Sequence, residues 1–359
     1  MKYIDEFRNP NLLKPLVARI HAHSGRPLRF MEFCGGHTHA IMRYGLRSLV
    51  APQVELVSGP GCPVCVSSNA DLDRAIALAQ VPDVILATFG DMIRVPGSYE
   101  SLQDAKARGA DVRIVYSSLD ALQLARDHRD RPVVMLGVGF ETTAPTIAAS
   151  VLRAQEERLD NFYVLALHKL TPPATRAILD AGEVHLDGII GPGHVTTIIG
   201  QDAWAFLPQQ YGLSCAISGF EPVDILRAVA ELVDSAESGQ PDVRNVYSRS
   251  VTRQGNRVAM ELLGRVFQIG PADWRGMGVV PDSGLAFRDE FSRFDAARAF
   301  PVVVQPPVEH KGCRCGAVLR GVIRPPDCPL FGTACTPARP IGPCMVSAEG
   351  ACAAYYQYQ

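Results

Sequence analysis

The residues with the clearest capacity for chemistry in this chain are its ten cysteines, which are unevenly placed. Three lie within the first 65 positions, Cys215 stands alone, and six lie between positions 313 and 352. The start, MKYIDEFRNP, is polar and charged, so we expect no signal peptide. No segment approaches the roughly 18 apolar residues of a membrane span. We therefore expect a soluble cytoplasmic protein, in which clustered thiols usually bind metal or do redox chemistry.

The strongest indication of metal binding comes from the C-terminal tail. Its cysteines are Cys313, Cys315, Cys328, Cys335, Cys344 and Cys352. From Pro301 onward the chain is rich in Pro, Gly and Cys and has too few large apolar residues to build its own core. We therefore expect a metal centre to stabilise this segment. Structural zinc sites usually show two close CxxC or CxxH pairs. This tail has one CxC and wide gaps, and Cys328 precedes a proline as in bacterial ferredoxins, which favours an iron–sulfur cluster over zinc.

A second motif, GPGCPVC, places Cys62 and Cys65 between a predicted strand (54–57) and a predicted helix (69–80). The partial positive charge of a helix N-terminus stabilises a nearby thiolate, so it can lower the pKa of thiols at such a junction. The pair is interpreted as a dithiol–disulfide redox pair or as two metal ligands. Half a zinc site or two packing cysteines is the alternative, and the surrounding sequence is not that of a thioredoxin.

The third motif, FCGGHTHA, follows another predicted strand and contains Cys34, His37 and His39. A lone histidine is more often a packing or capping group than a ligand, but two histidines and a cysteine in one glycine turn favour a site. Together with Cys62 and Cys65 these residues could form a Cys3His zinc site, and iron would suit the same ligands.

Polar residues also follow other predicted strands. Asp91 lies in TFGDMIRVPGS, Glu141 in GVGFETT, His168 and Lys169 in LHKLTPP, and His194 in GPGHVTTIIG. Each has an ordinary alternative role, such as an ion pair or a helix cap. GVGFETT lacks the third glycine of a dinucleotide fingerprint, which argues against a Rossmann cofactor site. Because ligands bind beyond the carboxyl ends of strands in open α/β sheets, their joint position predicts one shared cleft.

The fold class is predicted to be α/β with mainly parallel sheets. Strands are expected at 28–33, 54–57, 83–88, 111–116, 132–138, 162–167, 187–191 and 213–217. Amphipathic helices are expected at 69–80, 118–128, 143–157 and 221–238, and residues 251–270 are interpreted as one more helix. Continuous apolar strands separated by such helices indicate sheets covered on both faces.

Eight strands exceed one small sheet, so we predict two related α/β domains and a module. The expected bounds are 1–118, 119–300 and, for the Cys-rich module, 301–359. A weak internal echo supports related halves: residues 54–68 resemble 186–200, and residues 33–41 resemble 139–147. The net charge of -2 gives no footprint for nucleic acid or an anionic membrane.

Six motifs in order resemble the HypD family of [NiFe]-hydrogenase maturation proteins across essentially the whole chain. They are FCGGHTH, GPGCPVCVSS, TFGDMIRVPGS, GFETTAP, GPGHVTTIIG and the ending CPLFGTACTPARPIGPCMVSAEGACAAYY. The resemblance implies two α/β domains with related topology and a small module that holds a [4Fe-4S] cluster. It also implies a scaffold that acts with the small chaperone HypC to assemble the Fe(CN)2CO group, with cyanide supplied by HypE from carbamoyl phosphate through HypF.

Carried over by motif, Cys34 would be the iron ligand, and Cys62 and Cys65 the redox pair and further candidate iron contacts. His37, Asp91, Glu141 and His194 would line the cleft. The cluster ligands are expected to be Cys328, Cys335 and Cys352, with Cys313 as the fourth and Cys315 or Cys344 as alternatives.

The expected role is therefore an assembly scaffold with redox activity rather than a conventional turnover enzyme. Two other functions remain open at this point. One is a stand-alone iron–sulfur thiol–disulfide oxidoreductase, and the other is a zinc-stapled binding protein without redox chemistry.

Overall fold

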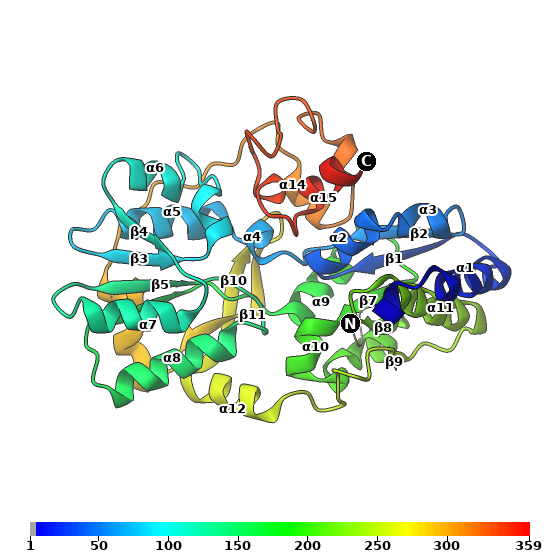
Figure 1. The fold of residues 1–359 in the computed structure, drawn as a ribbon, viewed down its shortest axis with the longest axis horizontal. Helices are drawn as coiled ribbons and strands as arrows, with labels where there is room; N and C mark the ends of the chain where they lie inside the picture. Colours follow the sequence, from blue (N-terminus) through cyan, green and yellow to red (C-terminus); the bar gives the residue numbers. More distant parts are fainter. Residues whose placement is uncertain (1–4) are drawn as a thin grey trace.

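Two parallel sheets organise the chain, which the computed structural model describes from residue 5 to residue 359 (Figure 1). The first sheet has the order β2 (Val54–Ser58), β1 (Leu28–Glu32), β7 (Gly188–Pro192), β8 (Ser214–Ser218) and β9 (Val243–Asn245). The second has the order β4 (Asp111–Ile114), β3 (Ile85–Thr88), β5 (Val133–Gly137) and β6 (Phe162–Ala166). The predicted α/β class is confirmed, and all eight predicted strands form.

Helices cover both faces of these sheets, as parallel strands require. The α-helices are α1 (Pro10–His23), α2 (Gly35–Arg43), α3 (Leu46–Val50), α4 (Pro63–Val66), α5 (Asn69–Ala79), α6 (Leu102–Ala107), α7 (Ser118–Asp127), α8 (Ala144–Glu156), α9 (Thr171–Ala181), α10 (Gly193–Ile199), α11 (Pro222–Ser238), α12 (Arg257–Val266), α13 (Ala296–Ala299), α14 (Cys315–Leu319) and α15 (Ala351–Tyr358). Short helical turns are η1 (Asp5–Arg8), η2 (Gly90–Arg94), η3 (Gln201–Trp204), η4 (Leu207–Tyr211), η5 (Asp289–Phe294), η6 (Pro325–Asp327) and η7 (Pro343–Met345). The helices predicted at 69–80, 118–128, 143–157 and 221–238 correspond to α5, α7, α8 and α11. Among the described residues, no helix is both long enough and apolar enough to span a membrane.

The chain leaves the first sheet after β2, builds the second sheet, and then returns. The return is fixed by the pairing of β7 with β1, in which Phe30 lies opposite Gly188. The predicted boundary at residue 118 therefore does not separate the sheets, because the first sheet takes strands from both sides of it. The Gly-Pro-Gly part of the internal echo does not mark two domains either, because its two segments lie at the ends of β2 and β7, which both flank β1 in the first sheet.

A long antiparallel hairpin, β10 (Phe267–Trp274) and β11 (Gly278–Phe287), runs between the two sheets (Figure 1). The prediction of a helix over 251–270 is correct only for α12. The helix begins after Asn256, whose side chain accepts a hydrogen bond from the Ala259 N–H, and it ends where Phe267 pairs with Phe287. The two rings lie 4.8 Å apart, so a partner strand distant in sequence overrides the local helical pattern at its end.

The Cys-rich C-terminal module sits above both sheets and is built around α14, η6, η7 and α15 (Figure 1). Residues 301–314, which lead into it, form no regular helix or strand. Helix α15 of the module packs on α2, and α14 and η7 of the module pack on α4. The module therefore rests on the helices that follow β1 and β2.

A buried histidine beside the second sheet lacks a hydrogen-bond partner. His168, just after β6, is 1% exposed, and neither ring nitrogen has a hydrogen-bond partner. The neighbouring Lys169 instead pairs with Asp71 at 2.8 Å. Burial lowers the pKa of His168 to about 3. The imidazole is therefore protonated at a much lower pH in the folded protein than in the unfolded chain.

Replacing His168 with Leu should stabilise the protein, because it removes two buried nitrogens that no group satisfies. We expect a gain of about 1–3 kcal/mol in the free energy of unfolding at pH 7. The gain should grow at pH 5, because protonation of the unfolded His168 destabilises the wild type as the pH falls from about 6.5 towards 3. Urea unfolding at both pH values measures this, and a variant less stable than the wild type at both would contradict it.

Candidate functional site

Cys34 lies at the end of β1 and caps the N-terminus of α2, where its side chain is partly exposed. Glu32, buried beneath it, accepts a hydrogen bond from the Cys34 N–H at 2.8 Å and another from the Thr38 hydroxyl. Burial raises the pKa of Glu32 to about 8. Burial, followed by the Glu349 and Glu32 carboxyls, raises the pKa of Cys34 to about 12, so this group rests as a neutral thiol.

The loop after β2 packs directly against Cys34. The Gly35 N–H donates to the Gly61 carbonyl at 2.9 Å. A Cβ on Gly61 would lie 2.2 Å from the backbone nitrogen of Cys34. This is a steric clash, so only glycine fits at this position. Gly61 therefore allows the close backbone approach that brings the CxxC motif beside Cys34.

Cys62 and Cys65 form a disulfide across the start of α4, with Cα atoms 5.2 Å apart. Both residues are buried, at 3% and 0% exposed, and the Cys65 N–H donates to the Cys62 sulfur at 3.2 Å. In this state the sulfurs are bonded to each other, so the suggested role as metal ligands applies only to the reduced dithiol.

The suggested Cys3His zinc site is not assembled in this structure. His37 is 0% exposed, and its Nε2 lies 2.9 Å from the Gly219 carbonyl oxygen. Its ring stacks on Phe220 at 4.6 Å between centroids, away from the disulfide. Within residues 5–359, no group of three or more His, Cys, Asp or Glu residues is placed so that it could hold a metal ion.

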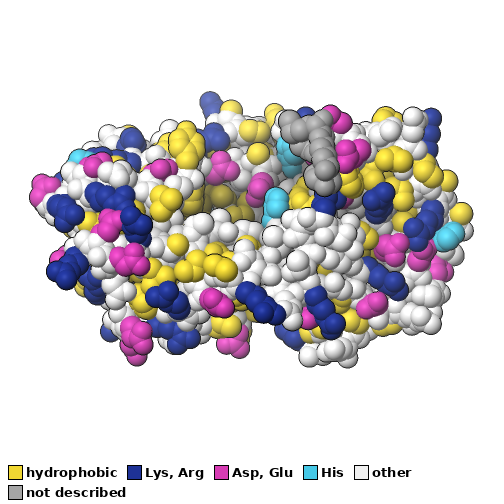
Figure 2. All heavy atoms as spheres, turned by 60° about the horizontal axis from the view of Figure 1, so that its bottom comes forward, with side chains coloured by type: hydrophobic (Ala, Val, Ile, Leu, Met, Phe, Trp, Pro, Cys, Tyr) yellow, Lys and Arg dark blue, Asp and Glu magenta, His cyan; other side chains and the backbone are white. Residues whose placement is uncertain are grey.

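A cleft of about 570 Å³ opens between the two sheets and contains the exposed side of Cys34. Asp91 and His194 also line it, so two of the four predicted cleft residues are brought together with Cys34 from the ends of β1, β3 and β7. Val64 of the disulfide helix forms part of its wall. Figure 2 looks toward this hollow between the two lobes.

Glu141, a predicted cleft residue like His37, does not line this cleft. Its carboxylate accepts hydrogen bonds from the Thr171 N–H at 2.7 Å and from the Thr171 hydroxyl at 2.9 Å, at the start of α9. It is 3% exposed, and burial raises its pKa to about 7. Glu141 thus binds the first residue of α9 and does not line the cleft.

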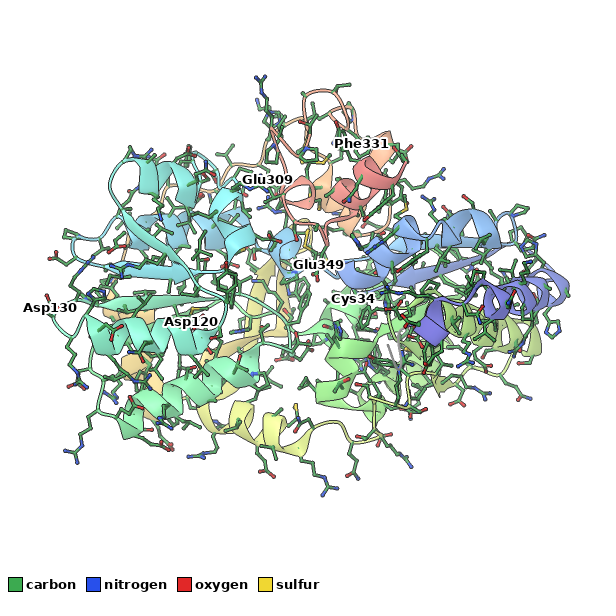
Figure 3. All side chains as sticks on the ribbon, viewed as in Figure 1. Cys34, Asp120, Asp130, Glu309, Phe331 and Glu349 are labelled. Carbon is green, nitrogen blue, oxygen red and sulfur yellow. A yellow bond between two sulfur atoms is a disulfide. The ribbon has the colours of Figure 1, made fainter. Side chains whose placement is uncertain are left out.

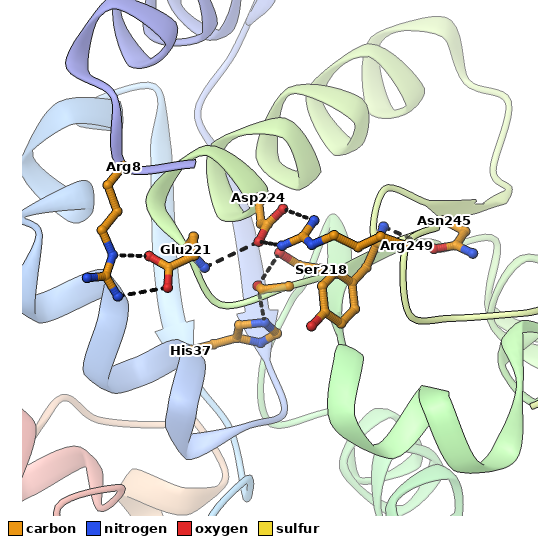
Figure 4. A network of polar contacts seen from close by, with 9 residues as sticks. Arg8, His37, Ser218, Glu221, Asp224, Asn245 and Arg249 are labelled. Carbon is orange, nitrogen blue, oxygen red and sulfur yellow. Dashed lines mark hydrogen bonds and ion pairs between the residues drawn. The ribbon is translucent and has the colours of Figure 1, made fainter. Parts of the chain in front are cut away.

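A polar network holds one wall of the cleft in place (Figure 4). Arg8 binds Glu221 through two hydrogen bonds, and Arg249 does the same to Asp224, which is 0% exposed. These pairs fix the turn after β8 that carries Phe220. A paired and hydrogen-bonded carboxylate is the form in which a buried charge is tolerated.

Phe220 is held between two histidines. Its ring stacks on the ring of His194, with the centroids 3.9 Å apart, and on the ring of His37, with the centroids 4.6 Å apart. The buried His37 therefore supports the cleft indirectly, by fixing the ring on which the cleft residue His194 lies.

The C-terminal module closes the site from above. A Cβ on Gly35 would lie 2.4 Å from the Glu349 carbonyl oxygen, and the Ser347 hydroxyl donates to Asp91 at 2.8 Å. Figure 3 shows Cys34 and Glu349 next to each other where the module meets both lobes. The Cys65 sulfur lies 4.0 Å from the Pro343 carbonyl oxygen, so residues 343–349 contact both the Cys34 loop and the disulfide.

All six tail cysteines line one enclosed apolar space, together with Leu330 and Phe331. Cys315 and Cys344 are hydrogen-bonded to each other, which lowers the pKa of Cys315 and raises that of Cys344. Cys344 is also hydrogen-bonded to Cys352, so these contacts do not select four ligands, and the set Cys313, Cys328, Cys335 and Cys352 stays a prediction. A set of four thiols around an apolar interior suits an iron–sulfur cluster chemically.

Comparison with known proteins identifies the family. Residues 11–359 match the HypD family, described as "Hydrogenase formation hypA family". Hydrogenase maturation factor HypD from Azotobacter vinelandii is 50% identical over 367 residues, covering 100% of this chain and 97% of that protein. The chain belongs to the HypD family of hydrogenase maturation factors.

Other members of the HypD family align equally completely. Hydrogenase maturation factor HypD from Cupriavidus necator is 47% identical over 368 residues, covering 100% of this chain and 97% of that protein. HypD from Escherichia coli K12 is 42% identical over 367 residues, covering 100% of this chain and 98% of that protein. The family resemblance read from the six motifs is thereby confirmed.

Sequence reasoning missed two acidic residues of the site, Glu32 and Glu349. Glu32 could have been found, because a carboxylate in an otherwise apolar strand next to a motif cysteine needs a buried partner. Glu349 gave no such signal, since it reaches Cys34 only through packing of the C-terminal module on Gly35.

Replacing Gly61 with Ala should destabilise the protein by about 1–3 kcal/mol, as overpacking does. The added methyl group would meet the Cys34 backbone at 2.2 Å, so the CxxC loop must move away. Thermal unfolding measures the loss. Gly264→Ala is the control, because a Cβ there meets nothing within 4 Å inside α12, and Ala should stabilise that helix by about 1 kcal/mol. A Gly61→Ala protein as stable as the wild type would contradict the packing argument.

Proposed function

We propose that this protein is the scaffold and redox partner on which the Fe(CN)2CO group of [NiFe]-hydrogenases is assembled, in the cytoplasm and together with a HypC-type chaperone and HypE. The observation that carries the proposal is the backbone contact between the Cys34 loop and the disulfide loop. It puts a partly exposed thiol in a cleft and a buried disulfide immediately behind it.

Cys34 is proposed to bind the iron that is being assembled. Its thiol rests protonated, so a bound cation must displace the proton, which makes binding dependent on the metal's own charge. A single protein thiolate leaves the other coordination positions of iron free for small ligands and for a partner's side chains. The cleft of about 570 Å³ has room for them beside Asp91 and His194.

Cys62 and Cys65 are proposed to exchange electrons with that iron site. Opening the disulfide takes two electrons and two protons, and forming it again releases them. Because the sulfurs are buried behind Cys34, this exchange is directed at the cleft.

The tail is proposed to hold a [4Fe-4S] cluster through Cys313, Cys328, Cys335 and Cys352, which would supply electrons one at a time. The chain's own residues keep this space apolar and place it close to the disulfide. Pro343, beside Cys344, contacts the Cys65 sulfur at 4.0 Å, so the wall of the tail space that carries Cys344 lies next to the disulfide.

The stand-alone thiol–disulfide oxidoreductase is less well supported. Such an enzyme must present one sulfur to a foreign disulfide, whereas Cys62 is 3% and Cys65 0% exposed. A protein partner at the cleft fits better, because Tyr116, which lines the cleft, is a large apolar side chain that is 93% exposed. Iron and sulfide analysis after anaerobic purification separates the zinc-stapled alternative, which requires zinc without sulfide.

Replacing Cys34 with Ala should abolish loading of the Fe(CN)2CO group and leave the cluster intact. The test is infrared spectroscopy of the protein co-purified anaerobically with its HypC-type partner, with nitrile and carbonyl bands expected only in the wild type. The visible absorption of the cluster should be equal in both proteins, since Cys34 lies outside the tail cavity.

The matched control is Cys215→Ala, which removes a cysteine that is 0% exposed inside β8 and should keep both signals. Nitrile and carbonyl bands of full intensity in the Cys34→Ala protein would mean that another residue holds the iron.

A further inference from the structure

The tip of the β10–β11 hairpin lies between the disulfide helix and the cysteine module (Figure 1). Trp274 forms a bridge with Ser67, just after α4, and the Arg275 N–H donates to the Val66 carbonyl at 2.9 Å. On the other side, a Cβ on Gly276 would lie 2.4 Å from the Cα of Gly316. The hairpin therefore contacts the residues that directly follow Cys65 and Cys315.

Arg275 at this tip is almost fully enclosed, at 6% exposed. Its Nε donates to the Ser67 carbonyl at 3.0 Å, and a terminal nitrogen donates to the Asn69 side-chain oxygen at 2.6 Å. Its remaining partner, the Glu309 carboxylate, is 3.5 Å away and itself 57% exposed. A well-solvated carboxylate at that distance only partly offsets the charge of the guanidinium.

The position of Arg275 relative to the cysteines follows from the same contacts. Because Gly276 packs on Gly316, the preceding residues Arg275 and Cys315 are brought to one place, and both line a groove that also reaches Cys313.

We propose that Arg275 is a positioning residue whose buried positive charge favours the reduced form of the cluster in the cysteine module. This inference rests on the proposed function, because it assumes that the module holds a cluster. Each electron added to a cluster with thiolate ligands adds negative charge, and a fixed cation in a poorly screened place stabilises that charge. Arg275 is held there by bonds to Ser67 and Asn69, so the charge sits on the side of the module that faces the disulfide.

The test is a redox titration of the cluster in the anaerobically purified full-length protein, followed by electron paramagnetic resonance. Arg275→Gln keeps a hydrogen-bonding side chain and removes the charge. At a fixed solution potential it should lower the ratio of reduced to oxidised cluster about tenfold, equivalent to ~59 mV for a one-electron couple. Arg275→Lys retains the charge and should stay close to the wild type.

Glu309→Gln provides a test of opposite sign that does not disturb the buried anchors of Arg275. Removing this partly compensating carboxylate should shift the ratio toward the reduced cluster, and the shift should shrink at high salt because Glu309 is exposed.

Three outcomes would overturn the inference: an unchanged potential in Arg275→Gln, an equal shift in Arg275→Lys, or a shift toward the oxidised cluster in Glu309→Gln. If Arg275→Gln fails to fold, the Glu309→Gln result decides alone. A wild-type protein without iron and sulfide would instead defeat the proposed function, so the two failures are distinguishable.

Discussion

The site depends on one backbone contact, in which Gly61 lies against Cys34 and accepts the Gly35 N–H. No side chain fits at that point, so two neighbouring strand-end loops approach as closely as backbones can. The contact puts the thiol of Cys34 in front of the Cys62–Cys65 disulfide and leaves only one of the two groups open to the cleft. Under the proposed function, this asymmetry would separate the thiol that binds iron from the disulfide that stores electrons.

The C-terminal module extends the same arrangement. Its residues 343–349 rest on Gly35 at one end and on the Cys65 sulfur at the other, and the β10–β11 hairpin fills the remaining space with Arg275. The Cys34 thiol, the disulfide and the six-cysteine cavity thus belong to one packed unit, although Cys34 and the tail cysteines lie nearly three hundred residues apart in the chain. The polar network around Asp224 and Arg249 holds the opposite wall, so the cleft is bounded by rigid parts on both sides.

Much of this could be predicted from the sequence, and the failures have a common cause. Buried strands such as β5 can be predicted from the sequence, because a short continuous run of apolar residues is stable only when it is buried in the core. Sheet membership is not readable, because the pairing of β1 with β7 joins residues about 160 positions apart and leaves no local pattern. Likewise, a position just after a strand predicts proximity to the cleft but not direction: His194 points into it, whereas Glu141 turns back to cap α9.

The central claim is that electrons delivered to the cysteine module open the disulfide behind Cys34. The direct measurement is differential alkylation of Cys62 and Cys65, read by mass spectrometry, in anaerobic cluster-loaded protein before and after reduction by a photoreduced flavin. The account predicts that both cysteines become alkylated after two electron equivalents in the wild type and stay closed in a Cys328→Ala protein that lacks the cluster. A disulfide that stays closed while the wild-type cluster is reduced, or that opens equally without the cluster, would contradict it.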